Sequence, residues 1–95
     1  MAIGAKAASH AWLGQKIMQR APKTSGVYAI FNKENWIYVG EASDLRVKLI
    51  AHFDGENACI KESAPFGFQF EVVPPKKRLA RKKQLVRELK PVCNR

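Results

Sequence analysis

The chain has 95 residues, of which 46% are hydrophobic, and a formal net charge of +9. This length and apolar content suit one small domain with a single core, spanning residues 1–95, and exclude a disordered chain. Residues 1–9 contain no long apolar run, so we expect neither a secretory signal nor a membrane span, and we expect a cytoplasmic protein. Cys59 and Cys93 lack the spacing of a zinc site or a disulfide scaffold, and we expect reduced thiols.

The first predicted element is a helix. Ser9 is a favoured N-cap, and the helix should run to about Arg20 and end before Pro22. Its apolar face would contain Trp12, Leu13, Ile17 and Met18. We interpret residues 1–21 as an N-terminal helical extension and residues 22–95 as the core of the domain.

Two related motifs follow, Gly26-Val27-Tyr28 and Tyr38-Val39-Gly40. The polar segment between them predicts a hairpin with strands at 27–31 and 36–39. Both tyrosines would then lie close together on one small sheet. Phenols near basic side chains suit a phosphate site, although tyrosine is also common in strands for packing reasons alone.

The middle of the chain predicts a second helix and a third strand. Ser43 should cap a helix over 44–53, with a core stripe of Leu45, Leu49 and Phe53. A loop or a short irregular turn of helix should follow at 54–65. Residues 66–73 alternate apolar and polar side chains, which predicts a strand whose phenylalanines face the core.

A basic helix completes the chain, between Pro74-Pro75 and Pro91. It contains a single acid, Glu88, and eight basic residues, namely Lys76, Lys77, Arg78, Arg81, Lys82, Lys83, Arg87 and Lys90. This concentration favours a polyanion such as nucleic acid over a membrane surface, and it is also compatible with a merely solvated helix face. Lys82 falls near the middle of the predicted apolar face, which comprises Leu79, Leu85, Val86 and Leu89. Either its stem packs while its ammonium reaches solvent, or this face borders a functional cleft.

The element order, α-β-β-α-β-α, predicts an α+β fold. Over residues 21–94, the chain resembles the GIY-YIG nuclease family, through the pieces Pro22-x-x-Ser25-Gly26-Val27-Tyr28, Tyr38-Val39-Gly40, Asp44-Leu45-Arg46, His52-Phe53 and Leu89-Lys90-Pro91-Val92-Cys93-Asn94. The family includes excinuclease subunits and intron-homing endonucleases. The resemblance implies a small three-stranded antiparallel sheet flanked by helices, and metal-dependent hydrolysis of one DNA strand.

The resemblance also assigns roles to single residues. Tyr28 would activate or orient the attacking water, and Tyr38 would bond near the scissile phosphate. Lys48 occupies the position of an expected arginine, and Lys82 that of the glutamate that holds the metal. Lysine lacks the two-point grip of arginine on phosphate, and an ammonium repels a divalent cation. His52 is not among the core catalytic groups of the family; by its own chemistry it could act as a proton donor in an active enzyme, although a histidine ending a helix more often meets the helix dipole.

We therefore expect a nucleic-acid-binding domain, with DNA as the favoured ligand, whose hydrolysis is impaired or lost and which needs no cofactor. The binding residues would be Lys48, Lys76, Lys77, Arg78, Arg81, Lys82, Lys83 and Arg87. One alternative is an endonuclease that makes single-strand nicks with Mg²⁺ or Mn²⁺ in a rearranged site. Glu41 could provide a carboxylate to that site if its loop folds inward. A second alternative is a scaffold for a protein partner.

Overall fold

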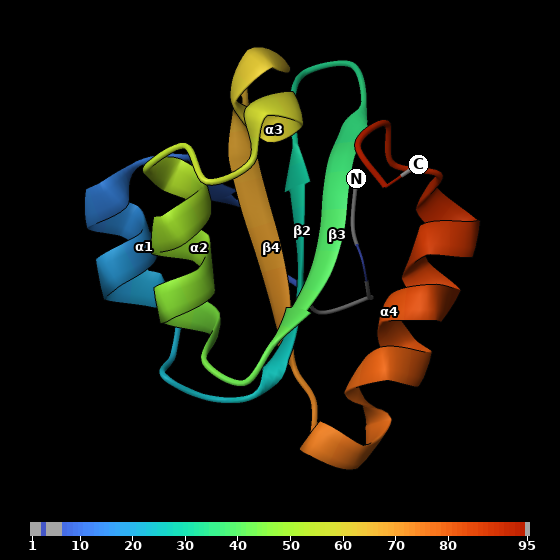
Figure 1. Ribbon diagram of the computed structural model, residues 1–95. Helices are drawn as coiled ribbons and strands as arrows, with labels where there is room; N and C mark the ends of the chain where they lie inside the picture. The colour runs from blue at the N-terminus through green and yellow to red at the C-terminus, as the bar shows by residue number, and fades with distance from the viewer. Residues whose placement is uncertain (1–2, 4–6, 95) are drawn as a thin grey trace.

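The computed structural model describes Ile3 and residues 7–94. Four antiparallel strands form one sheet in the order β1-β4-β2-β3. Helices α1, α2 and α3 cover one face of this sheet, and α4 covers the other (Figure 1). The elements are β1 (His10–Ala11), α1 (Gly14–Arg20), β2 (Gly26–Phe31), β3 (Trp36–Ala42), α2 (Leu45–Phe53), α3 (Ala58–Glu62), β4 (Gly67–Val72) and α4 (Pro75–Leu89).

Strand β2 is the centre of the molecule, and all six of its residues are buried. Its side chains alternate between two cores, as a pleated strand requires. Tyr28 and Ile30 face the core under α1 and α2, whereas Val27 and Ala29 face the core under α4. The α+β fold with helices on both faces of an antiparallel sheet is therefore confirmed.

The N-terminal prediction is wrong in part. Residues 10 and 11 form β1, which adds a fourth strand by pairing with β4, and the helix begins only at Gly14. The Ser9 hydroxyl accepts a hydrogen bond from Gln69 Nε2 at 2.7 Å instead of capping a helix. Leu13 and Met18 are each 53% exposed, so they lie outside the core.

The second helix follows its prediction except at its ends. Asp44 rather than Ser43 is the N-cap, because its carboxylate accepts a hydrogen bond from Val47 N–H at 3.0 Å. At the other end the buried side chain is His52, and Phe53 is exposed. His52 is buried in place of Phe53 because its imidazole is hydrogen-bonded to the Tyr28 hydroxyl.

The last two predicted elements have fewer core residues than expected. In β4, Phe68 is fully buried, but Val72 at the end of the strand is exposed, as is Phe66 immediately before the strand begins. In α4, Leu85 is buried and Leu79 is 52% exposed. Within the described residues, no helix is both long and apolar enough to cross a membrane.

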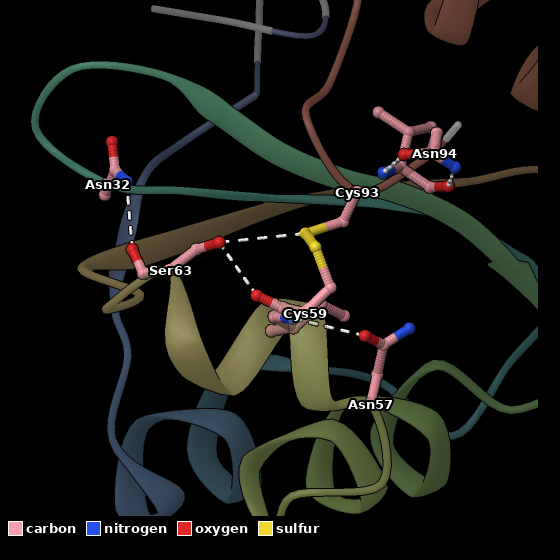
Figure 2. The surroundings of a disulfide bond; sticks show 8 residues. Asn32, Asn57, Cys59, Ser63, Cys93 and Asn94 are labelled. Atoms are coloured by element: carbon pink, nitrogen blue, oxygen red, sulfur yellow. Dashed lines mark hydrogen bonds between the residues drawn. A yellow bond between two sulfur atoms is a disulfide. The ribbon is translucent and has the colours of Figure 1, made fainter.

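The two cysteines form a disulfide between Cys59 of α3 and Cys93 of the C-terminal tail (Figure 2). The prediction of reduced thiols is therefore wrong. The two residues are 34 positions apart in sequence, and the fold brings their Cα atoms to 5.8 Å, within the range that a disulfide needs. The Ser63 hydroxyl donates to the Cys59 carbonyl oxygen at 2.7 Å, at the end of the same helix.

Candidate functional site

The glycines of the two motifs are required by close packing. Gly40 lies opposite Tyr28 in the β2–β3 register, and a Cβ at Gly40 would overlap the Tyr28 phenol. A Cβ at Gly26 would lie 2.7 Å from Leu45 Cδ1 and would overlap the main chain of Glu71. The second motif therefore makes room for the tyrosine of the first.

Three side chains meet above these glycines, and we call Tyr28, Tyr38 and His52 the tyrosine cluster. The Tyr28 hydroxyl and His52 Nε2 are 2.7 Å apart and hydrogen-bonded. The ring centroids of Tyr38 and His52 are 5.4 Å apart, and those of Tyr38 and Tyr28 are 6.1 Å apart. Tyr28 and His52 are buried, whereas Tyr38 is half-buried. Only Tyr38 thus offers the solvent a substantial part of its side chain.

Burial keeps both hydrogen-bonded members of the cluster neutral at pH 7. It raises the pKa of Tyr28, and the neighbouring Tyr38 raises that pKa further. It also lowers the pKa of His52, with a smaller contribution from the positive charge of Lys48. The Tyr28 hydroxyl and His52 Nε2 share one hydrogen bond, whose direction follows the imidazole tautomer, and His52 Nδ1 has no partner among the described residues. The structure gives His52 a hydrogen-bond partner in Tyr28, and its interaction with the helix dipole stays a prediction.

Lys48 lies one turn before His52 on α2, at the border of the cluster. Its ammonium donates to Glu56 Oε1 at 2.8 Å, and this hydrogen bond lowers the pKa of Glu56. Both side chains are substantially exposed, so the pair is a weak one that a ligand can displace. Glu56 was missed by the sequence reasoning, since it lies in an irregular segment after α2 that has no helical periodicity.

The cations of α4 fall into two groups. Arg78 pairs with Glu41 at 2.9 Å, and Arg81 pairs with Glu71 at 2.8 Å, so these arginines attach the helix to the sheet. The described residues supply no ion-pair partner for the remaining basic side chains of the helix, Lys76, Lys77, Lys82, Lys83 and Arg87. Sequence reasoning had placed both groups on the same binding surface.

Three of the unpaired cations surround one hollow. A groove of about 390 Å³, which we call the α4 groove, is lined by Leu79, Lys82, Lys83, Val86, Arg87 and Asn94. Its far wall is the C-terminal tail, where Asn94 Nδ2 donates to the Val39 carbonyl oxygen and Asn94 Oδ1 accepts from Val39 N–H. Because Val39 follows Tyr38 in β3, the groove lies across the edge strand of the sheet from the tyrosine cluster.

The residues of this region do not fit a divalent metal ion. No group of three or more His, Cys, Asp or Glu side chains in the described part of the chain is arranged to hold one. Glu41, the carboxylate that could have turned inward, is bound to Arg78. Lys82 lines the α4 groove, and the positive charge of its ammonium would repel a hard cation.

A family model, the GIY-YIG catalytic domain, matches residues 24–91, which is more than half of the chain. The chain belongs to the GIY-YIG family. The UvrABC system protein C of Fervidobacterium nodosum is 40% identical over 52 residues, which are 52% of this chain and 9% of that protein. The chain thus matches less than a tenth of the length of this curated relative.

Solved structures agree with this family in fold. The magnesium-bound GIY-YIG N-terminal endonuclease domain of UvrC from Thermotoga maritima superposes with a TM-score of 0.73 at 24% identity, covering 86% of this chain and 96% of that one. A point mutant of the same domain, bound to its catalytic divalent cation, gives the same TM-score at 23% identity and the same coverage.

Proposed function

We propose that this GIY-YIG domain binds nucleic acid through backbone phosphates and has impaired or lost phosphodiester hydrolysis. The observation that carries the proposal is the ammonium of Lys82, which lines the α4 groove at the position where the family resemblance expects a metal-binding carboxylate. Without a hard-cation site, the region keeps cations suited to holding phosphate and lacks the group that would stabilise a leaving oxygen.

The electrostatics of the surface support a polyanionic ligand. Lys76 and Lys77 at the start of α4 are exposed, and Lys82, Lys83 and Arg87 continue the charge along the helix to the groove. Cations without carboxylate partners can neutralise phosphates and release their counterions. DNA is the favoured ligand, because related domains are described as endonucleases and belong to the UvrABC system.

The tyrosine cluster would assist binding rather than react. Tyr38 can donate its hydroxyl to a phosphate oxygen, and Lys48 can supply a charge once it leaves Glu56. Tyr28 and His52 are buried and hydrogen-bonded to each other, and the Tyr38 ring packs against both of them.

Fluorescence anisotropy with a labelled DNA duplex in EDTA tests this proposal. The affinity should fall steeply with salt, with a slope of log K against log salt near −0.9 for each phosphate contacted, so about −3 to −5 for three to five contacts. Sequence should have little effect. Binding of DNA that is absent, or insensitive to salt, would contradict the proposal and leave the protein-scaffold alternative.

A metal-dependent endonuclease is the second candidate, and one observation favours it. The tyrosine cluster and Lys48 gather on the same side of the sheet, as a catalytic set would. A nicking assay on supercoiled DNA with Mg²⁺ or Mn²⁺ separates the two candidates, with Tyr38→Phe as the control against contaminating nucleases. Nicking that disappears in this variant would show that hydrolysis survives.

A further inference from the structure

The α4 groove has the features of a built site. Its lining combines two apolar side chains, Leu79 and Val86, with three positively charged ones. Lys82 is half-buried and lines the groove, as expected of a long side chain whose aliphatic stem packs while its charge stays in solvent. A cavity of about 390 Å³ accommodates a phosphate group and the sugar next to it.

The wall opposite α4 is held in place by independent contacts. The tail pairs with the edge of β3 through Val92 N–H to the Trp36 carbonyl oxygen at 3.1 Å and Cys93 N–H to the Ile37 carbonyl oxygen at 2.8 Å. Asn94 adds its two bonds to Val39, and the disulfide ties the tail to α3 (Figure 2). The groove is therefore preformed, which lowers the ordering cost of binding.

The charges of the groove are free to act on a ligand. The two arginines on the sheet side of α4 are neutralised by Glu41 and Glu71, but no described carboxylate lies within ion-pair distance of Lys82, Lys83 or Arg87. Three neighbouring cations without counter-charges repel one another until an anion arrives. A phosphodiester supplies that anion and places an apolar sugar edge against Leu79 and Val86.

We propose that the α4 groove binds a backbone phosphate of a nucleic-acid strand directly, with Lys82 as the central contact and no bridging divalent cation. This inference rests on the proposed function and makes it specific. It assigns the phosphate to a defined groove instead of the general charge of α4. It also predicts that magnesium competes with the protein for phosphate instead of assisting binding.

The test compares two charge reversals in the 95-residue chain. Lys82→Glu acts in the groove, and Lys23→Glu makes the same change in net charge in the exposed loop between α1 and β2. Lys82→Gln removes the charge while it keeps most of the stem. The probe is a labelled DNA oligonucleotide, and the dissociation constant is measured by anisotropy with EDTA and with magnesium.

Lys82→Glu should weaken binding in EDTA by tenfold or more, on the scale of a lost charge-assisted contact worth roughly 1.5–3 kcal/mol. Lys82→Gln should weaken it by a smaller factor, and Lys23→Glu should change it least. Wild-type affinity should be equal or higher in EDTA than in magnesium. Circular dichroism on each variant establishes that the fold is intact.

Three results would overturn the inference. Equal losses in Lys82→Glu and Lys23→Glu would mean that only overall charge matters, and the proposed nucleic-acid binding would still stand. A requirement for magnesium in the wild type would restore a bridging cation. Failure of the wild type to bind DNA at all would remove the proposed function itself, before any variant is compared.

Discussion

The tyrosine cluster and the α4 groove lie on either side of the edge strand β3, and they differ in almost every physical property. In the cluster, Tyr28 and His52 are buried and hydrogen-bonded to each other at 2.7 Å, and Tyr38 is half-buried. The groove is open, positively charged and free of carboxylate partners among the described residues. The residues that identify the family thus shape the fold, whereas the residues available to an anion are ordinary lysines and an arginine.

The family motif therefore has a structural role that is independent of catalysis. The glycines of the two motifs, Gly26 and Gly40, are required by contacts that persist whether or not the domain hydrolyses anything. A metal site has no such second reason to be kept. The two motif glycines can therefore persist whether or not a chain binds a metal ion.

Breaking the disulfide should have the largest effect on stability, because this bond joins α3 to the C-terminal tail that forms one wall of the α4 groove. Removing a cross-link that closes a loop of 34 positions costs about 4 kcal/mol in the chain-entropy model. The double variant Cys59→Ser with Cys93→Ser should lose that much free energy of unfolding in urea. The reduced wild type is the matched comparison and should lose a similar amount. Two free thiols found in the untreated native protein would contradict the cross-link.

Gly40→Ala tests whether the motif serves packing. The added methyl group would collide with the Tyr28 phenol, and we expect a loss of about 3 kcal/mol, at the upper end for overpacking. Urea denaturation measures the loss. Gly14→Ala is the control, since a Cβ there would lie 3.4 Å from Phe53 in ordinary contact. Equal stability of the two variants would show that Gly40 has another role.

Tyr28→Phe tests the tyrosine cluster directly, because it removes one buried hydroxyl and leaves the α4 groove unchanged. It deletes the hydroxyl bonded to His52 and leaves a buried imidazole without that partner, which should cost about 2 kcal/mol. Tyr38→Phe should cost clearly less, because the Tyr38 ring is half-buried. Neither variant should alter the salt dependence of DNA binding as strongly as Lys82→Glu. A larger loss in Tyr38→Phe would reverse the assignment of structural and exposed roles within the cluster.

The smallest predicted effect concerns pH. Burial lowers the pKa of His52 below its ordinary value of 6.5, so between these two values the unfolded chain binds more protons than the native one. The free energy of unfolding is therefore unaffected by His52 above pH 6.5 and falls as the pH drops from 6.5 toward the native pKa of His52. Melting temperatures between about pH 5 and pH 8 should show this decline, and His52→Gln should reduce it.

His10→Gln provides the control for the pH experiment. The pKa of His10 is also lowered by burial, but its side chain is only half-buried, so the variant should keep most of the decline. A pH profile that is unchanged in His52→Gln would mean that other groups dominate the acid side.

The sequence determined the elements whose signals are local. Alternation and turn residues located the hairpin strands, the motifs identified the family, and the basic run between two prolines marked α4. The tertiary structure decided where partners come from distant segments. It turned residues 10 and 11 into a strand because β4 has a free edge there, and it buried His52 instead of Phe53 because Tyr28 supplies a hydrogen bond.

The same reason explains the charges and the cysteines. No periodicity within α4 reveals that Arg78 and Arg81 meet Glu41 and Glu71 on the sheet while Lys82 faces the tail. No spacing reveals that Cys59 and Cys93 meet across the molecule. Secondary-structure propensity depends on residues that are close along the chain, so it can be predicted from the sequence. The partner of a charge or a cysteine depends on the three-dimensional packing of distant segments.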